Sequence, residues 1–392
     1  MFSTKAHFFS NLQVLKKKIM PLVVFLILVG CSELDKKQII EKKISLKSAF
    51  QHQFLIGAAI NENQILGRDS LAQKLIRGEF NSISPENCMK WKFLHPKKNT
   101  FFFETSDKFV AYGIDNDMFI IGHTLVWHSQ LAPWAAMVDN KEELSNNLKN
   151  HITTIVGRYK SRINGWDVVN EALNEDGTLR ESVFLKVLGD GYLSDSFKWA
   201  KEADPSAELY YNDYNLCNKE KRDGVIKLVK NLQENGAEID GIGMQGHWNL
   251  EGPSLEDIEA SILAYYNLGL KVMITELDIT VLPNPNDLEG AEVNQHFENS
   301  AFMNPYPAKL PDSISIKLAK RYQDIFKLFK KHSEKISRVT FWGVNDNQSW
   351  LNNWPVKGRK NYPLLFDRDY QPKVAYDSVI NIIVNSQKNP IN

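Results

Sequence analysis

Short apolar runs alternate with longer amphipathic stretches along the chain from Phe54 onward. Short apolar runs fit buried strands, and stretches in which apolar residues recur every three or four positions fit helices packed on one face. Eight such runs lie at residues 54–60, 80–84, 118–124, 165–169, 209–212, 241–245, 271–276 and 338–342. Helical patterns between them include residues 144–159, 219–234, 255–266 and 313–332. Eight parallel strands joined by helices close into a ring, so we predict an α/β fold, a single (β/α)8 TIM barrel.

Polar or aromatic side chains follow most of these runs at the point where each run ends. They are Glu86, Asn87, His123, Asn170, Glu171, Asn212, Asp213, Gln245, His247, Glu276, Asp278 and Trp342. Barrel enzymes build their active sites at the carboxyl ends of the strands, and buried polar groups cost free energy unless they are paired. We therefore predict an active site at this end of the barrel. A long loop at residues 282–311, rich in Pro and Asn, is expected to be a binding element beside it.

The first thirty residues have the layout of an export signal. Lysines at positions 16–18 precede an apolar run at residues 19–29. This run is shorter than the roughly 20 residues that span a bilayer, and its charged-then-apolar order is typical of a secretory signal. Its ending, Leu28-Val29-Gly30-Cys31, resembles the lipobox of bacterial lipoproteins, which implies cleavage before Cys31 and a lipid on the sulfur. The alternative is an ordinary signal peptide with an incidental cysteine.

These patterns divide the chain into three segments. Residues 1–30 are predicted to be a lipoprotein signal peptide, residues 31–49 a polar tether, and residues 50–388 the catalytic barrel. The tether is assigned because its sequence is rich in charge. We expect the protein to be exported and lipid-anchored at Cys31 to a bacterial membrane, on the periplasmic face or at the cell surface.

Charge and cysteine content narrow the function classes. Basic and acidic residues both number 47, so no net charge favours nucleic acid, and a neutral substrate suits the chain. The three cysteines are far apart, which argues against a disulfide framework or a cysteine metal site. Nine Trp are present, and some of these flat side chains could stack on sugars, although most aromatic residues serve in protein cores.

Two glutamates are candidates for glycoside hydrolysis, which needs two carboxyl groups flanking the scissile bond. Glu171, in WDVVNEAL, and Glu276, in VMITELDIT, end the fourth and seventh runs, which lie on facing parts of an eight-stranded ring. Carboxyl groups about 5 to 5.5 Å apart would imply the retaining, double-displacement route. Taken separately, each could instead be a solvated or ion-paired residue at the rim.

The surrounding motifs resemble those of the xylanases of glycoside hydrolase family ten. In order, they are SPENCMKW, GHTLVWH, WDVVNEAL, YYNDYN, GIGMQGHW, ITELDI, FWGVNDNQSWL and YPLLFD. The resemblance extends from about Phe50 to Asp377. It implies a retaining endo-β-1,4-xylanase that acts on xylan or xylo-oligosaccharides and needs no metal or cofactor. We expect a monomer.

The resemblance also implies roles for individual residues. Glu171 would be the acid/base and Glu276 the nucleophile. Asn170 would bind the 2-hydroxyl of the sugar beside the cleaved bond, and His247 would bridge Glu276 and Asp278. The remaining implied sugar-binding residues are Glu86, Asn87 and Lys90 for the next sugar on the non-reducing side, His123, Trp127 and Gln245 for the cleavage subsite, Trp342 and Trp350 for its floor and lid, and Tyr214 for stacking on the leaving-group side. His128 and Asp213 would tune the acid, although His128 could equally be a structural hydrogen-bond partner.

Three other readings remain open. A metal-dependent barrel hydrolase could use His123, His128 and His247, although the odd spacing of the first two places them on opposite sides of a continuous strand. A glycan-binding lipoprotein would keep the aromatic cleft without cutting. A β-1,4-glucanase or mixed xylanase and cellulase is the nearest alternative enzyme; since xylose lacks the C6 hydroxymethyl group, the bulk of Trp342 and Trp350 would favour xylan by excluding that group.

Overall fold

The computed structural model describes residues 44–288 and 290–388, which belong to one compact unit. The predicted signal peptide and most of the predicted tether, including Cys31, lie outside the described residues. Within the described part of the chain, no helix is long and apolar enough to cross a membrane.

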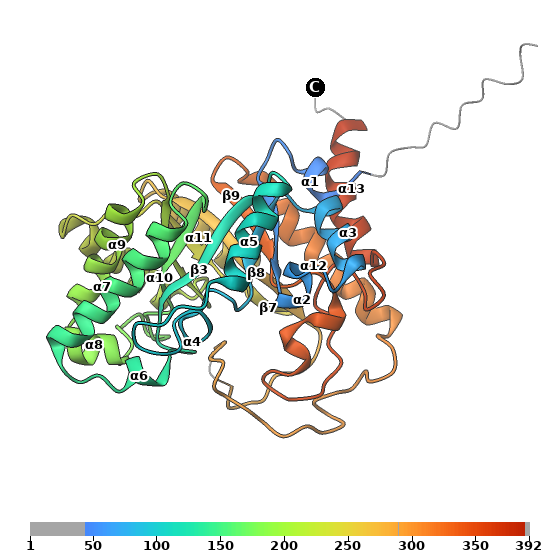
Figure 1. The fold of residues 1–392 in the computed structure, drawn as a ribbon. Coiled ribbons are helices and arrows are strands. Elements are labelled where there is room, and N and C mark those ends of the chain that lie inside the picture. Colours follow the sequence, from blue (N-terminus) through green and yellow to red (C-terminus); the bar gives the residue numbers. More distant parts are fainter. Residues whose placement is uncertain (1–43, 289, 389–392) are drawn as a thin grey trace, which may run out of the picture. The chain divides into compact units, whose positions relative to one another are not determined.

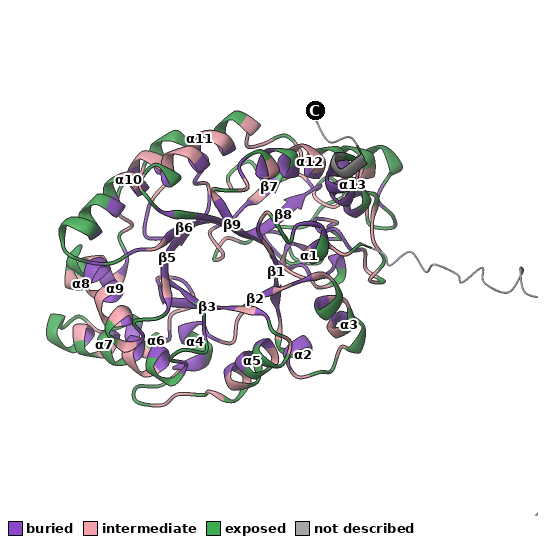
Figure 2. Ribbon diagram, turned by 90° about the horizontal axis from the view of Figure 1, so that it is seen from above, coloured by how far each residue is buried: buried purple, intermediate pink, exposed green. Residues whose placement is uncertain are grey.

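Eight parallel strands form the closed barrel that the sequence predicts (Figure 2). Neighbours along the ring are β1 to β6 in chain order, then β8 and β9, and β9 pairs with β1 in parallel to close it. The bounds are β1 Leu55–Ile60, β2 Ser82–Pro85, β3 Phe119–Trp127, β4 Gly165–Asn170, β5 Glu208–Asp213, β6 Gly241–Met244, β8 Lys271–Thr280 and β9 Ile336–Phe341. A short additional strand, β7 (His247–Asn249), pairs with the end of β8. The predicted fold class is confirmed.

A long helix follows each barrel strand and packs outside the ring (Figure 1). These helices are α3 (Ser70–Glu79), α5 (Glu104–Asp115), α7 (Lys141–Arg158), α9 (Gly191–Ala203), α10 (Lys219–Glu234), α11 (Leu255–Tyr266), α12 (Asp312–Lys331) and α13 (Val374–Lys388). Short helices in the connections are α1 (Leu46–Ala49), α2 (Glu62–Ile65), α4 (Trp91–Leu94), α6 (Pro133–Ala136) and α8 (Val183–Leu188). The four helical segments expected from the sequence agree with α7, α10, α11 and α12 to within a few residues.

Local sequence explains where such a helix begins and which face it buries. Ser254 caps α11, because its hydroxyl accepts a hydrogen bond from the backbone N–H of Asp257 at 3.1 Å. Ile258, Ile262 and Tyr265 are buried and recur at positions four and three apart, so they share the face that packs on the barrel.

The beginning of the domain differs from the prediction. Residues 44–49 were assigned to the polar tether, but they lead into and form α1, which contacts α3 and α13. Leu46 is fully buried, and its N–H donates to a Glu79 carboxylate oxygen at 2.8 Å. The prediction failed because lysines and serines surround Leu46, Ala49 and Phe50, whose spacing nevertheless places three apolar side chains on the core.

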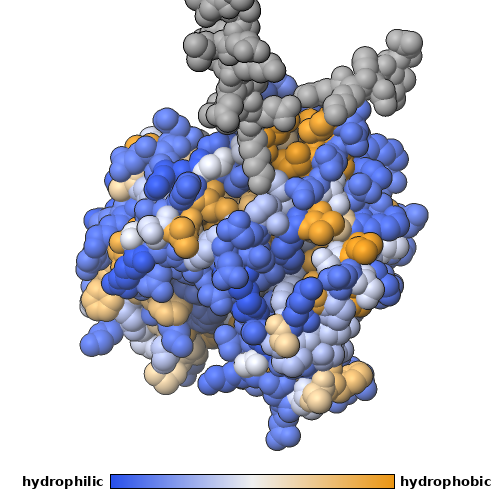
Figure 3. Space-filling model, turned by 90° about the vertical axis from the view of Figure 1, so that its right-hand side faces the viewer, coloured by the Kyte–Doolittle hydropathy of each residue, from blue (hydrophilic) through white to orange (hydrophobic). Residues whose placement is uncertain are grey.

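Most of the face shown in Figure 3 is hydrophilic, with apolar side chains in small separate groups. This is the usual surface of a folded soluble domain, where scattered exposed apolar residues need no special explanation. The main core packs the strands against the helices around them, and a smaller separate cluster joins Ile121 of β3, Tyr210 of β5 and Met273 of β8.

Candidate active site

A cleft of about 450 Å³ opens at the carboxyl ends of the barrel strands. It brings together twelve of the residues predicted from the sequence: Glu86, Asn87, Lys90, His123, Trp127, Asn170, Glu171, Gln245, His247, Glu276, Trp342 and Trp350. These residues come from segments far apart in the chain, so their convergence is a result of barrel closure. A cleft of this size that collects several polar groups is a typical small-molecule or glycan site.

Glu171 lies directly after β4 and is held by three side-chain donors. The Trp127 indole N–H donates to its Oε2 at 2.7 Å, and the amides of Gln245 and Asn170 donate to its Oε1 at 2.9 and 3.1 Å. Its backbone has φ of 57°, a left-handed conformation that costs non-glycine residues about 1–3 kcal/mol. The hydrogen bond from its own N–H to the Asn212 carbonyl, at 2.9 Å, helps to fix that conformation. The side chain is therefore presented to the cleft in one orientation.

The environment of Glu171 favours its protonated form. Burial raises the pKa of this carboxyl above its ordinary value, and the nearby charges of Asp213 and Glu276 raise it further. The charge of His128 and the hydrogen bond from Gln245 act in the opposite direction without cancelling the effect. His128 and Asp213 thus lie close enough to influence Glu171 electrostatically, and their role in tuning it stays a prediction.

Glu276, in β8, sits in the opposite kind of environment. The Asn212 amide donates to its Oε1 at 2.8 Å, and His247 Nε2 lies 3.3 Å from its Oε2. The other ring nitrogen of His247 lies 3.0 Å from Asp278 Oδ1, and Asp278 Oδ2 accepts the Trp350 indole N–H at 2.7 Å. The predicted bridge of His247 between Glu276 and Asp278 is present.

This bridge keeps Glu276 ionised. Burial alone would lower the pKa of His247, but the charge of Asp278 and the hydrogen bonds to both carboxylates raise it to about 10. Burial alone would raise the pKa of Glu276, but the hydrogen bond from His247 and the charges of His247, His123 and Lys90 bring it below its ordinary value. The surroundings therefore favour the protonated form of Glu171 and the ionised form of Glu276. A pair of catalytic carboxyls needs this difference in protonation.

Glu86, Asn87 and Lys90 form a connected polar wall on one side of the cleft. Lys90 Nζ donates to Asn87 Oδ1 at 3.1 Å, and the Asn87 amide donates to Glu86 Oε1 at 3.2 Å. Lys90 Nζ also lies 5.1 Å from the ring centre of Trp127 and 5.8 Å from that of Trp342. Burial raises the pKa of Glu86 and lowers that of Lys90. A sugar hydroxyl can exchange hydrogen bonds with such a wall without displacing a strong ion pair.

The aromatic and imidazole side chains around the carboxyls are also fixed by partners. His123 Nδ1 lies 2.9 Å from Asp167 Oδ2, and its ring meets Trp342 edge to face at 5.3 Å. Trp350 stacks on Trp354, with ring centres 4.4 Å apart. Trp342 and Trp350 both line the cleft, and their role as its floor and lid stays a prediction.

Asp213 lies behind the cleft wall and is fully buried. Its Oδ1 is 3.0 Å from the Lys221 ammonium, and its Oδ2 accepts the Tyr211 hydroxyl at 2.5 Å. Lys221 is buried as well, so the pair satisfies both charges away from water. Asp213 can thus act on Glu171 through its charge but cannot contact a sugar in this structure.

The structure does not expose Tyr214 to the cleft, contrary to its predicted role as a stacking platform. Only 3% of the residue is exposed. Lys221 Nζ lies 3.7 Å from the ring centre, and the backbone of Gly290 is so close that a Cβ there would lie 2.4 Å from a ring carbon. The ring is covered because the chain after β8 folds back over it, which no local pattern in YYNDYN could indicate.

The covering chain, residues 282–311, is named the strap here; all of it except residue 289 is described. Glu292 anchors it to the acid side of the cleft. The carboxylate of Glu292 lies 3.1 Å from His128 Nε2, accepts the Ser129 hydroxyl at 3.1 Å, and lies 3.5 Å from an Arg180 nitrogen. Ala291, Val293 and His296 of the strap line the cleft. The predicted binding loop therefore borders the site. It follows β8, but Glu292 attaches it to the wall of the cleft opposite that strand.

Three residues at the site received no individual role from the sequence. Asn212, which hydrogen-bonds Glu276, was predicted to lie at the active-site end of the barrel, but its contact with Glu276 was not predicted. Trp354 and Gln348 line the cleft from the connection after β9; Gln348 lies within the motif segment NDNQSWL, whereas Trp354 lies three residues beyond its end. Among residues 44–288 and 290–388, no group of three or more His, Cys, Asp or Glu side chains is arranged to hold a metal ion.

Comparison with known proteins agrees with this geometry. The chain matches the family described as glycosyl hydrolase family 10 over residues 45–382. It is 40% identical to endo-1,4-beta-xylanase A of Xylanibacter ruminicola over 359 residues, 90% of this chain and 97% of that protein. It is 40% identical to an endo-1,4-beta-xylanase of Geobacillus stearothermophilus over 350 residues, 86% of this chain and 98% of that protein. A solved endoxylanase of the same family from a sugarcane soil metagenome is 42% identical with a TM-score of 0.82, covering 87% of this chain and all of that chain. The chain therefore belongs to glycosyl hydrolase family 10.

Proposed function

We propose that this protein is a retaining endo-β-1,4-xylanase with Glu171 as acid/base and Glu276 as nucleophile. The observation that carries the proposal is the opposite bias of the two carboxyls in one cleft: the pKa of Glu171 is raised and that of Glu276 is lowered. Membership of family 10 and the endo-xylanase names of the similar proteins support the same activity.

In the first step, a Glu276 carboxylate oxygen attacks the anomeric carbon while the glycosidic C–O bond breaks. The proton of Glu171 goes to the departing oxygen, and the sugar is left as an ester of Glu276. In the second step, ionised Glu171 takes a proton from water as the water oxygen attacks the same carbon and the Glu276 ester bond breaks. Two inversions return the β configuration, and Glu171 recovers its proton.

The neighbouring groups serve these steps. Asn170 lies between the two carboxyls, with its amide N–H on Glu171 and its carbonyl accepting from the Asn212 amide at 2.8 Å. A hydrogen bond to a sugar 2-hydroxyl held in this position would become stronger as positive charge develops on the sugar ring. His247, whose raised pKa keeps it protonated, stabilises the carboxylate of Glu276 when the ester is cleaved.

The substrate is xylan or xylo-oligosaccharides. Trp342 and Trp350 stand at the cleft as fixed plates and leave little freedom beside the sugar ring. Because xylose has no C6 hydroxymethyl group, exclusion of that group by these indoles favours xylan over cellulose.

The test is proton NMR of the anomeric region during early hydrolysis of a soluble xylan, with carboxymethyl-cellulose in parallel. First-formed β-anomers from xylan alone are expected. Initial α-anomers would overturn the double-displacement route, and cleavage of cellulose alone would change the substrate. Cleavage of neither polymer would favour the alternative of a non-catalytic glycan-binding protein.

The location of the enzyme is a separate part of the proposal. The lysines at positions 16–18, the apolar run and the lipobox-like sequence ending at Cys31 support export and attachment of a lipid at Cys31. Two or three acyl chains at about 0.8 kcal/mol per buried CH₂ hold a protein firmly on a membrane. The barrel would then act as a monomer tethered to a bacterial membrane.

A further inference from the structure

A second groove, of about 760 Å³, lies next to the catalytic cleft and is lined from α2, α4, the segment after β2 and the start of α5. We propose that this groove binds the xylan chain beyond the sugars held by Glu86, Asn87 and Lys90, on the non-reducing side. The proposal rests on the proposed xylanase function and adds a distal binding site to it. Phe93 and Phe102 are the platforms on which the chain would lie.

The groove is continuous with the catalytic cleft. Asn87 lines both, so a chain that leaves the polar wall in the non-reducing direction enters the groove at this residue. A second connection lies at Asn61, which lines the groove and donates its side-chain N–H to Gln348 Oε1 at 3.1 Å. Gln348 lines the cleft. The border between the two spaces therefore consists of amide side chains, which can bind a sugar hydroxyl from either side.

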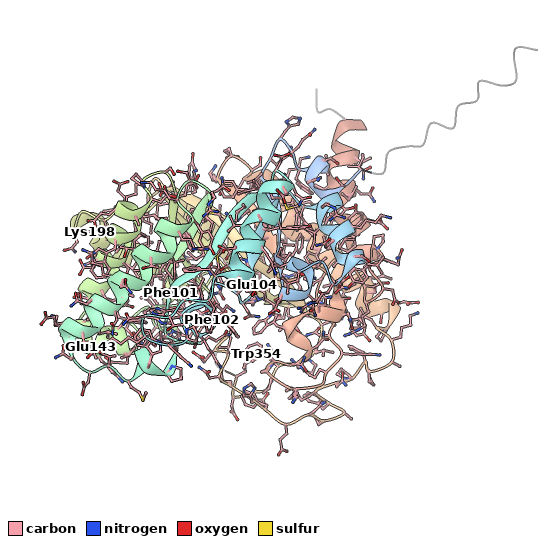
Figure 4. The ribbon with its side chains drawn as sticks, in the orientation of Figure 1. Phe101, Phe102, Glu104, Glu143, Lys198 and Trp354 are labelled. Carbon is pink, nitrogen blue, oxygen red and sulfur yellow. The ribbon has the colours of Figure 1, made fainter. Side chains whose placement is uncertain are left out.

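Two phenyl rings are exposed in this groove. Phe93 is 46% exposed and Phe102 is 58% exposed, although apolar side chains of this size normally contribute to the core. The neighbouring Phe101 turns inward and stacks on the His95 ring at 3.9 Å. In the segment before α5, Phe102 is therefore exposed while its neighbour Phe101 is not. Figure 4 labels Phe102 together with Glu104.

The rings are held in place by the backbone. The N–H of Phe102 donates to the carbonyl of Leu94, the last residue of α4, at 2.7 Å, so the segment that carries Phe102 is tied to the helix that carries Phe93. A preorganised aromatic surface binds with less loss of conformational entropy than a mobile one. Xylose rings present an apolar C–H face that can lie flat on such a surface.

The polar part of the groove suits a neutral ligand. Glu62 is paired with Arg68 at 3.5 Å, and Glu104 with Lys108 at 2.9 Å, so the charges at the groove are largely balanced. Asn61, Asn63 and Thr105 supply amide and hydroxyl groups. This combination of aromatic faces, uncharged hydrogen-bonding groups and balanced charge matches an uncharged sugar chain better than an ionic partner.

The test compares a long and a short substrate in the full-length protein. Xylohexaose can reach the groove, whereas an aryl β-xylobioside fills only the two sugar positions nearest the cleaved bond. The double variant Phe93→Ala/Phe102→Ala should lower kcat/KM for xylohexaose about tenfold relative to the aryl xylobioside, which corresponds to about 1.4 kcal/mol of lost binding. The loss should appear as a higher KM, because the groove binds sugars that do not react.

Two further variants separate stacking from general damage. Phe93→Tyr/Phe102→Tyr keeps both flat rings and should retain the wild-type ratio of the two kcat/KM values. Tyr266→Ala removes a ring that is 41% exposed on α11, away from both spaces, and should also retain it.

The outcomes are distinct. An unchanged ratio of the two kcat/KM values in the alanine variant, or an equal loss on both substrates, would contradict binding of the xylan chain in the groove. The proposed function would remain in place. Failure of the wild-type enzyme to hydrolyse the aryl xylobioside and xylan would overturn the proposed function, and the groove with it.

Discussion

The side-chain amide of Asn212 donates to Oε1 of Glu276 at 2.8 Å and to the side-chain Oδ1 of Asn170 at the same distance. Because the Asn170 amide in turn donates to Glu171, one chain of hydrogen bonds joins the two catalytic candidates. The Thr275 hydroxyl donates to Asn212 Oδ1 at 2.6 Å. This contact fixes the orientation of the Asn212 amide, so that its nitrogen points at Glu276. The orientation of Glu276, the proposed nucleophile, therefore depends on a residue that need not touch the reacting atoms.

Asn212→Ala should lower kcat about 10- to 100-fold, since a hydrogen bond to a charged group contributes about 1.5–3 kcal/mol. KM for xylo-oligosaccharides should change much less, because the sugar contacts remain. Steady-state kinetics on xylotetraose would measure both. Asn150→Ala, at an exposed position of α7, is the control for asparagine loss. If the Asn212 variant kept the wild-type kcat, Asn212 would not contribute to catalysis.

Glu171→Ala should distinguish the acid from the nucleophile. Without a proton donor, cleavage of xylan should fall about 10²- to 10⁴-fold, whereas attack on an aryl xylobioside with a good leaving group should be largely spared. Glu276→Ala is the comparison and should lose turnover of both substrates, since no bond to the sugar can form. The measurements are release of the aryl group from the xylobioside and release of reducing ends from xylan. Equal losses on both substrates in the Glu171 variant would contradict the acid assignment.

The pH dependence of kcat/KM should be bell-shaped. Activity requires ionised Glu276, so it falls as the pH drops through the lowered pKa of that group. It also requires protonated Glu171, so it falls as the pH rises through the raised pKa of that group. His247→Gln removes a hydrogen bond and a positive charge from Glu276 and should move the acidic limb to higher pH. Profiles on an aryl xylobioside would show the shift, and His52→Gln, at an exposed position, should leave the limb in place.

The barrel could be predicted because its strands are buried on both faces. Such strands read as nearly continuous apolar runs, and the polar residue that ends each run faces the open end of the ring. The end of β8 was harder to place: the strand continues past Glu276 to Thr280 because β7 pairs with it there. His247 and Asp278 are opposite one another in that pairing, which brings the bridge to Glu276.

Long-range contacts account for what the sequence did not predict. Glu292 meets His128 across 164 positions of the chain, and no periodicity or motif relates the two. The covered ring of Tyr214 follows from the same strap, since Gly290 lies against it. The motif identified Tyr214 as a residue of the site, but its exposure depends on a loop whose path is fixed by contacts and not by local propensity.

Cys31→Ser should release the protein from membranes, because only the thiol can carry the diacylglycerol of a lipoprotein. Fractionation of cells into membrane and soluble material, with xylanase activity as the readout, would measure the change. Cys88→Ser is the matched control, since Cys88 lies within the barrel domain and should not affect attachment. Unchanged retention of the Cys31 variant on membranes would contradict lipid attachment at Cys31.

Glu292→Gln should weaken the anchor of the strap without changing its shape. The carboxylate faces His128, Ser129 and Arg180. Burial alone would raise its pKa, but the hydrogen bond and charge of His128 and the hydrogen bonds from the Asn294 backbone N–H and the Ser129 hydroxyl lower it to about 2. A depressed folded-state pKa means that the stabilisation is present above the unfolded value near 4.5 and disappears as the pH falls through about 2. At pH 7 the variant should therefore melt about 1–3 °C lower, a modest shift for a partly solvated ion pair.

Calorimetry of both proteins between pH 7 and pH 2 would follow this difference, which should stay constant down to about pH 5 and then shrink as the pH falls from about 4.5 to about 2, where first unfolded and then folded Glu292 becomes protonated. Glu234→Gln, at an exposed position near the end of α10, should show no comparable difference at any pH. A melting difference that stayed constant with pH would mean that the glutamine disturbs packing of the strap and that the charge of Glu292 does not hold it. A difference that disappears between about pH 4.5 and pH 2 would mean that the ionised carboxylate of Glu292, beside His128, holds the strap in place.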